Sequence, residues 1–241
     1  MTKPQTIHFD GIDIHLVGPM DALLKALAAA HQITSRPERM ALIVGDQGMG
    51  KTLGSRLFAS QHDDVVYLQI PPASILRPGR LLQMLEHALD MLAGPGAAPT
   101  LFDRTHAIIA DLQRRSRMIL FDNANRIGRY GYVDLLRYIH DEAGTRMAFI
   151  SIPSLEHFFG QHLEFAGRCG LRYRLQPATR DDIAAILTDF PAEAVAKIHE
   201  MSGGRMRQVM VLAEHFRRNP KAERSPSNVE KIARVFTPRA A

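Results

Sequence analysis

The chain has 241 residues, of which 46% are hydrophobic and 23% charged, a composition typical of a globular protein with a sizeable core. No apolar run approaches the ~20 residues of a transmembrane helix, and the first residues have neither the basic start nor the apolar core of a secretory signal. The single cysteine, Cys169, excludes an intramolecular disulfide and a cysteine-based zinc site. We therefore expect a cytoplasmic protein.

In chain order, a possible hairpin at residues 7–18 is followed by helices and strands that alternate. Apolar spacing predicts helices at 20–33, 51–60, 80–94, 101–116 and 130–144. Compact apolar runs predict strands at 40–44, 64–70, 117–122, 146–152 and 171–177. Strands that alternate with helices of about 10–15 residues predict an α/β fold, with a parallel sheet flanked by helices on both faces.

After Pro177 the pattern changes, because no further strand is predicted. The remaining helices are expected at 179–190, 192–204, 206–219 and 225–236. We place a domain boundary here, with an α/β core and its N-terminal extension at 1–177 and a small all-helical domain at 178–241.

The net charge of +5 arises from the C-terminal segment. Residues 1–216 carry equal numbers of basic and acidic side chains, whereas Glu223 and Glu230 are the only acids that follow. A basic segment on a neutral body indicates either a contact with a polyanion or an ordinary solvated helix surface, and both interpretations are kept. The basic residues of this tail are Arg217, Arg218, Lys221, Arg224, Lys231, Arg234 and Arg239.

A phosphate-binding loop is predicted between the strand at 40–44 and the helix at 51–60. The eight residues match G-x-x-x-x-G-K-[ST] at every fixed position, and a glycine-rich turn without a ligand is the alternative that this context disfavours. Backbone N–H groups and the helix N-terminus would surround the phosphates, Lys51 would reach the β- and γ-phosphates, and Thr52 would ligate magnesium. The predicted nucleotide-binding residues are Gly45, Asp46, Gln47, Gly48, Met49, Gly50, Lys51 and Thr52.

The strand at 117–122 delivers Asp122 to the carboxyl edge of the predicted sheet, where ligands bind in such folds. Its carboxylate would hold Mg²⁺ opposite Thr52, and capping of the next turn is the alternative role. The next residue is Asn123, whose amide can orient a water but cannot accept a proton from it. Asp141 or Glu142, on the following helix, could substitute as a base.

The chain resembles AAA+ ATPases over residues 20–216, because "LIVGDQGMGKT", "MILFDNAN", "RMAFISIPSL" and "SGGRMRQVMVL" occur in the order and at the intervals of that family. It is most similar to the transposition-helper branch, which includes the phage Mu B target-DNA activator, TniB and TnsC, and to the related ExeA-like ATPases. Members generally carry glutamate where this chain has Asn123, so the resemblance implies ATP binding with slow hydrolysis.

The resemblance also implies roles for polar residues outside the phosphate-binding loop. Ser151 would be sensor 1, near the γ-phosphate, although a serine that merely ends a strand is common. Arg207 would be sensor 2 at the start of a lid helix, with Arg205 as its competitor. Arg168 would be an arginine finger that acts on a neighbouring subunit, and Arg172 is the second candidate. The core would then be a P-loop NTPase fold and the helical domain its lid.

The expected function is that of a bacterial, nucleoid-associated regulator of transposition. ATP would drive a homo-oligomer, either a ring or a helical filament, to assemble on duplex DNA and mark it for a transposase. The chain has no Trp, so we expect contacts to phosphates with low sequence preference. The alternatives are an ExeA-like or signalling ATPase that assembles a protein machine without DNA, and a scaffold with negligible turnover. Candidate DNA contacts are Arg77, Arg80, Arg126 and Arg129.

Overall fold

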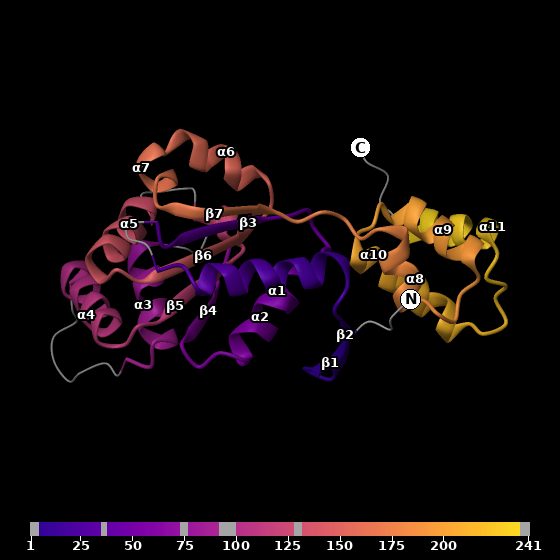
Figure 1. The fold of residues 1–241 in the computed structure, drawn as a ribbon, viewed down its shortest axis with the longest axis horizontal. Helices are drawn as coiled ribbons and strands as arrows, with labels where there is room; N and C mark the ends of the chain where they lie inside the picture. Colours follow the sequence, from indigo (N-terminus) through magenta and orange to yellow (C-terminus); the bar gives the residue numbers. More distant parts are fainter. Residues whose placement is uncertain (1–4, 35–37, 73–76, 92–99, 128–131, 237–241) are drawn as a thin grey trace. The chain divides into compact units, whose positions relative to one another are not determined.

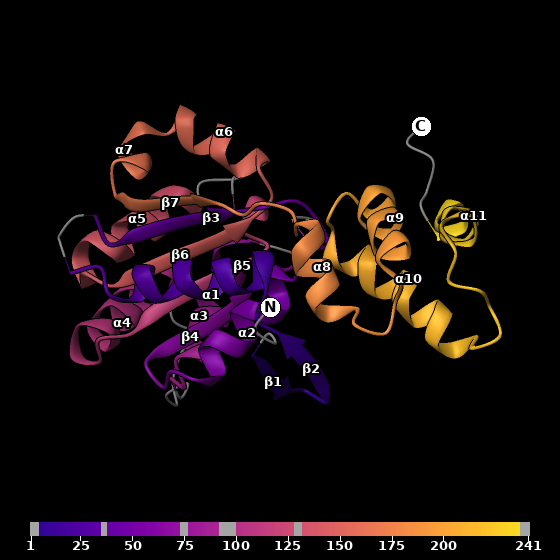
Figure 2. The same cartoon turned by 45° about the vertical axis from the view of Figure 1, so that its right-hand side comes forward.

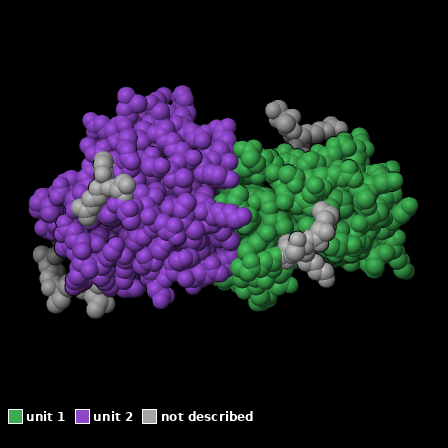
Figure 3. All heavy atoms as spheres, in the orientation of Figure 1, with its two compact units in different colours: residues 1–22, 46–50, 175–241 green, residues 23–45, 51–174 purple. Residues whose placement is uncertain are grey.

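The computed structural model describes residues 5–34, 38–72, 77–91, 100–127 and 132–236. The chain divides into two compact units (Figure 3). Unit 1 consists of Met1–Ala22, Asp46–Gly50 and Leu175–Ala241, and unit 2 of Leu23–Gly45 and Lys51–Arg174. The helical C-terminal part belongs to unit 1 from Leu175 on, and the N-terminal segment and the loop at 46–50 are grouped with it.

Unit 2 is built on a parallel sheet of five strands, in the order β4-β5-β6-β3-β7 (Figure 1). The strands are β3 (Met40–Val44), β4 (Val65–Gln69), β5 (Met118–Asp122), β6 (Arg146–Ser151) and β7 (Cys169–Arg174). Helices connect them, as right-handed crossovers between parallel strands require. This arrangement confirms the predicted α/β class.

The register of the sheet brings distant polar residues to one edge. Val44 pairs with Ser151, and Asp122 pairs with Ile150, so β3, β5 and β6 end at the same level. Strands of a parallel sheet all point the same way, and their carboxyl ends therefore form one common edge. The residues that follow β3 and those that end β5 and β6 are thus neighbours, although up to about a hundred residues separate them along the chain.

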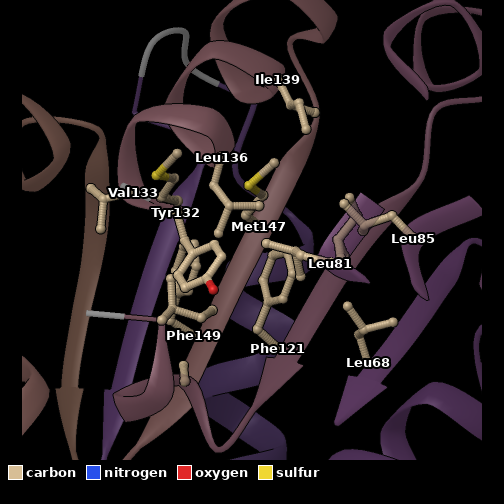
Figure 4. Packing of buried hydrophobic residues seen from close by; sticks show 14 of the residues in the cluster. Leu68, Leu81, Leu85, Phe121, Tyr132, Val133, Leu136, Ile139, Met147 and Phe149 are labelled. Carbon is tan, nitrogen blue, oxygen red and sulfur yellow. The ribbon is translucent and has the colours of Figure 1, made fainter. Parts of the chain in front are cut away.

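One face of the sheet carries the larger hydrophobic core (Figure 4). Alternate strand residues such as Leu42, Phe121 and Phe149 point into it, as the period of two in a strand requires. The rings of Phe121 and Phe149 stack with centroids 5.1 Å apart. The helices that bury residues here are α3 (Pro78–Ala88), α4 (Leu101–Arg114), α5 (Tyr132–Ala143), α6 (Ser154–Gln161) and α7 (Leu163–Ala166).

Helix α2 (Lys51–Ser60) contacts β4 and β5. Its buried Leu57 and Phe58 are not part of the larger hydrophobic core described above, so they cover the opposite face of the sheet. Figures 1 and 2 both show α1 (Gly18–His31) beside α2. The sheet therefore has helices on both faces, as expected.

Three helices differ from the sequence prediction. Helix α3 ends at Ala88 rather than at residue 94, because Asp90 takes a left-handed conformation with φ 55° that a helix cannot continue through. The predicted remainder at 92–94 lies outside the described residues, as do the predicted loop at 94–99 and the start of the helix expected at 130. Helices α6 and α7 were not predicted, because each has too few buried positions to show a helical period. In α6 the buried residues are Leu155 and Phe159.

Unit 1 contains a hairpin and a bundle of helices. Strands β1 (Thr6–Phe9) and β2 (Ile12–His15) pair through a two-residue turn, in which Asp10 and Gly11 both have positive φ. Helix α8 begins with a reciprocal capping box between Thr179 and Asp182. The helices are α8 (Arg180–Ile186), α9 (Ala192–Ser202), α10 (Met206–Arg218) and α11 (Pro226–Phe236).

The core of this helical unit is continuous across all four helices, with Ile183, Ile198, Phe216 and Val229 fully buried. No helix in the described residues has the length and the apolar character needed to cross a membrane.

Asp189 ties the α8–α9 connection to the basic tail. Its carboxylate pairs with Arg217 and Arg224, each at 3.1 Å, and the Arg224 guanidinium also lies 4.3 Å from the centroid of Phe190. The hydrogen bond from Arg217 is the main reason that the pKa of Asp189 lies below its ordinary value of 3.8. Two of the tail's basic residues are therefore engaged in ion pairs within the helical unit.

We expect Asp189→Asn to lower the free energy of unfolding by roughly 0.5–1 kcal/mol near pH 7, because the pairs are partly exposed. A depressed carboxylate pKa contributes stability above the unfolded-state pKa, and this contribution is lost as pH falls through the folded-state pKa. The difference from the wild type should therefore shrink below about pH 4. Urea unfolding across this pH range measures it, with the exposed Glu223→Gln as the matched control.

Candidate functional site

The phosphate-binding loop starts at the end of β3 and leads into α2. Lys51 is the first residue of α2, and its Nζ donates a hydrogen bond of 2.6 Å to the carbonyl oxygen of Gly45. The Gly45 N–H in turn donates to the Ser151 carbonyl at 3.1 Å, which fixes the start of the loop to the end of β6. The lysine is therefore folded back over its own loop, where a phosphate oxygen could replace the carbonyl as its acceptor.

Asp122 ends β5 at the carboxyl edge, between β4 and β6, and is 1% exposed. Its Oδ2 accepts hydrogen bonds from the Thr52 hydroxyl at 2.8 Å and from the Tyr67 hydroxyl at 3.0 Å. Its Oδ1 accepts from the Asn123 N–H at 2.8 Å. The predicted proximity of Thr52 and Asp122 is thus present in the structure.

The surroundings of Asp122 fit a divalent cation. Among the described residues its carboxylate has three neutral donors and no ion-paired cation. Buried carboxylates are usually paired with a positive charge or coordinate a metal ion. Thr52 and Asp122 supply the hydroxyl and carboxylate oxygens that Mg²⁺ prefers.

Tyr67 is a member of the site that the sequence analysis missed. It lies in β4, and burial together with the charge of Asp122 raises the pKa of its hydroxyl well above the ordinary value. The tyrosine therefore remains a hydrogen-bond donor at physiological pH. A tyrosine within an apolar strand was the only signal in the sequence, and the position of β4 beside β5 was needed to interpret it.

Asn123 adopts the left-handed conformation, with φ 57° and ψ 36°, and precedes a short 3-10 helix at Ala124–Arg126. Asparagine and aspartate tolerate this region better than other residues with a Cβ, because their short polar side chains form local hydrogen bonds. The residue type at this position is thus compatible with its backbone as well as with a polar role.

Ser151 ends β6 and is 2% exposed. Its Oγ is buried and has no hydrogen-bond partner among the described residues. A buried hydroxyl without a partner costs about 1–3 kcal/mol, so this position favours a ligand with a polar atom in reach.

The tip of the loop, Asp46–Gly50, belongs to unit 1 and is fixed there by α10. The Arg207 N–H donates to the Gly48 carbonyl at 2.9 Å. Gly48 and Gly50 have φ of 84° and 83°, a region that favours glycine. A Cβ on Gly48 would lie 3.2 Å from the Arg207 Cβ, and one on Gly50 would lie 2.9 Å from Met20 Cε.

The two candidates for sensor 2 differ in their partners. The Nε of Arg205 donates to the Ser202 carbonyl at 3.2 Å, so this guanidinium stays with the end of α9. The Arg207 side chain is exposed, and its guanidinium makes no hydrogen bond to any other described residue.

Arg168 lies at the amino edge of the sheet, where its carbonyl accepts from the Met40 N–H. Its Nε and Nη2 donate to the two carboxylate oxygens of Asp141, both at 2.5 Å, and this bidentate pair raises the pKa of Arg168. The second candidate, Arg172, donates to the Ala166 carbonyl at 2.8 Å. The five residues of the neighbouring β3 span about 16 Å between Arg168 and the carboxyl edge, so this arginine cannot reach Lys51 and Thr52 of its own chain.

The same geometry corrects one expectation. Asp141 and Glu142 lie in the last turn of α5, immediately before β6 begins at Arg146. They are therefore at the amino edge, opposite Asp122, and Asp141 is already paired with Arg168. Neither can act as the base that Asn123 lacks.

The candidate DNA contacts fall into two groups. Arg77 and Arg80 are exposed at the start of α3. Arg126 instead donates to the Ile70 carbonyl at 2.6 Å, which fastens the end of β4, and Arg129 lies outside the described residues.

In the basic tail, all four described arginines have carboxylate partners. Beyond the Asp189 pairs, Arg218 binds Glu214 at 2.7 Å and Arg234 binds Glu230 at 2.5 Å. Arg239 lies outside the described residues. The tail is therefore less available to a polyanion than its composition indicated.

Comparison with known proteins adds a family and a set of similar folds. The family described as "AAA domain" matches residues 34–159, just over half of the chain. No curated protein matches the chain.

Among solved structures, the Orc1 protein of Aeropyrum pernix in complex with DNA is similar with a TM-score of 0.60 and 18% identity, over 90% of this chain and 64% of that one. Cdc6p from Pyrobaculum aerophilum matches with a TM-score of 0.61 and 16% identity, over 85% and 63%. The RuvB Holliday junction branch migration motor of Thermotoga maritima matches with a TM-score of 0.54 and 16% identity, over 90% of this chain and 66% of that one. The chain spans less than two thirds of each, and at these identities the likeness concerns the fold alone.

Proposed function

This chain belongs to the AAA domain family, and from that premise we propose that it is an ATP-binding switch with slow ATP hydrolysis that assembles on duplex DNA. More specifically, we propose that the assembled protein marks DNA as a target for a transposase. The observation that carries the nucleotide part is the buried Asp122 carboxylate, which has only neutral donors among the described residues.

In the ATP-bound state, Lys51 exchanges the Gly45 carbonyl for oxygens of the β- and γ-phosphates. The N–H groups of the loop at 46–50 and the start of α2 stabilise the remaining phosphate charge. Thr52 and Asp122 hold Mg²⁺, which when bound neutralises charge on the phosphates. The Ser151 hydroxyl donates to the γ-phosphate, and this satisfies its orphaned oxygen.

Hydrolysis is slow because the residue that follows Asp122 is Asn123, which has an amide in place of a carboxylate. The Asn123 amide orients the reacting water without accepting its proton, and a positioned general base is worth typically about 10²–10⁴-fold in rate. Asp141 and Glu142 lie at the far edge of the sheet and do not compensate. The ATP-bound state therefore persists long enough to act as a signal.

Assembly through Arg168 is part of the proposal, and the position of this arginine at the amino edge supports it. This arginine is too far from its own loop to serve it, so its action requires a neighbouring subunit with nucleotide at the interface. Binding there exchanges the carboxylate of Asp141 for phosphate oxygens, which a guanidinium also recognises in bidentate geometry. In the subunit that holds this nucleotide, its own Arg207 contacts the γ-phosphate from the lid.

DNA as the substrate of assembly is supported by the similar folds, since one structure is described as a complex with DNA and another as a branch migration motor. Within this chain, Arg77 and Arg80 are exposed and have no carboxylate partner among the described residues. The test is electron microscopy of the protein with ATP, with duplex DNA, with both and with neither. Rings or filaments that need both components support the proposal.

We expect the double variant Arg77→Ala/Arg80→Ala to weaken ATP-dependent binding to random duplex DNA. Each lost phosphate contact lowers the slope of log K against log salt by about 0.9, so the slope should fall by roughly 2. Fluorescence anisotropy at several salt concentrations measures it. The matched control is Arg218→Ala/Arg234→Ala, which removes the same charge from ion-paired arginines of the lid. Equal slopes in both variants would show that the arginines at the start of α3 do not contact DNA phosphates.

The alternative is an ATPase that assembles a protein machine without DNA, and the carboxylate partners of the basic tail favour it. ATP-driven assembly with no DNA binding at about 50 mM salt, where phosphate contacts are strongest, would select this alternative.

A further inference from the structure

We propose that Tyr67 is a positioning residue that selects which oxygen of Asp122 faces the metal ion. The inference rests on the proposed binding of Mg-ATP and assigns a role to a residue outside the phosphate-binding loop. Its basis is that the hydroxyls of Tyr67 and Thr52 donate to the same carboxylate oxygen.

The acceptor sites of Asp122 are unequally used. Each carboxylate oxygen offers about two lone-pair sites. On Oδ2 both are taken, by Thr52 at 2.8 Å and by Tyr67 at 3.0 Å. On Oδ1 the Asn123 N–H takes one, at 2.8 Å, and the other remains for a metal ion or a metal-bound water.

The positions of the two donors explain why the carboxylate is held in one orientation. Gln69 of β4 pairs with Asp122 of β5, and Tyr67 lies two residues earlier on the same face of the sheet. Thr52 approaches from α2, which packs on both strands. The carboxylate is thus gripped between a helix and a neighbouring strand, and rotation about its Cβ–Cγ bond would break both hydrogen bonds.

A merely structural role for this hydrogen bond makes a different prediction. Tyr67 is half-buried, and tyrosine hydroxyls generally take a polar partner wherever the ring packs. A bond of that kind would affect the stability of the sheet and leave the metal requirement unchanged. The choice of metal ion therefore separates the two roles, because Mg²⁺ demands near-ideal octahedral geometry whereas Ca²⁺ accepts irregular sites.

The test is Tyr67→Phe, which removes the hydroxyl and keeps the ring. Binding of a fluorescent ATP analogue is measured against Mg²⁺ and, separately, Ca²⁺, and also in EDTA. Loss of a residue that orients a metal ligand typically costs about 10–100-fold in metal affinity, so half-saturation by Mg²⁺ should rise at least about 10-fold. The Ca²⁺ requirement should change much less, and nucleotide affinity in EDTA should be unchanged.

Tyr173→Phe is the matched control, since this tyrosine lies in β7 and is 38% exposed. Thermal unfolding of each variant in EDTA reports whether the fold is retained. A Mg²⁺ requirement for Tyr67→Phe equal to that of Tyr173→Phe, or parallel losses for Mg²⁺ and Ca²⁺, would overturn the positioning role. Failure of the wild type to bind the analogue with Mg²⁺ would instead overturn the proposed function.

Discussion

Replacing Lys51 by alanine is expected to lower the affinity for ATP by at least about 100-fold and to abolish ATP-driven assembly. A hydrogen bond between charged groups contributes about 1.5–3 kcal/mol, and this lysine would make such bonds to two phosphates. In the absence of nucleotide the side chain donates to the Gly45 carbonyl of its own loop, and thermal unfolding reports whether the fold is retained in the variant. Isothermal titration calorimetry with a non-hydrolysable analogue, followed by light scattering, measures both effects.

Lys221→Ala is the control for this variant, because it removes the same charge from an exposed position of the lid. Unchanged ATP affinity in Lys51→Ala, with the fold intact, would mean that the loop is not a phosphate-binding site. If assembly is lost while ATP affinity is retained, the lysine is needed for ATP-driven assembly and not for ATP binding.

Asn123→Glu is expected to raise the ATPase rate by at least about 10-fold. A positioned base can supply about 10²–10⁴-fold, and the left-handed backbone at this residue opposes part of the gain, since glutamate tolerates that region less well than asparagine. The rate is measured as phosphate release at saturating Mg-ATP, with and without duplex DNA.

Asn123→Gln is the matched control, because glutamine has the size and the backbone cost of glutamate without its carboxylate. A rate increase in the glutamate variant alone identifies the missing base as the limit on turnover. Equal rates in both variants would show that another step, such as formation of the subunit interface, controls hydrolysis.

The residues of the carboxyl edge could be predicted because strand ends are visible in the sequence. Asp122 and Ser151 each end an apolar run, and a parallel sheet collects such ends at one edge whatever the order of its strands. The hydrogen bond between Thr52 and Asp122 follows from this rule together with the glycine-rich loop.

Tyr67 could not be predicted, because its role depends on strand order. Periodicity identifies β4 as a strand but does not reveal that β5 is its neighbour. The left-handed backbone of Asn123 is likewise hidden, since the same asparagine would suit an ordinary turn.

The sequence showed that the tail is basic, but only the structure shows that its arginines pair with carboxylates of the helical unit. Asp189 lies 28 residues before Arg217, a separation at which sequence offers no pairing rule. Helices α6 and α7 escaped prediction for a related reason, since their length leaves too few buried positions to establish a period.

The bond between the loop tip and α10 uses the backbone N–H of residue 207, whereas γ-phosphate sensing would use its side chain. These two properties can therefore diverge independently in evolution. Any residue with an N–H at position 207 preserves the attachment of the loop, so a descendant could lose its response to the γ-phosphate by one substitution and still keep the loop and the lid joined. A change of signalling behaviour would then require no change of architecture.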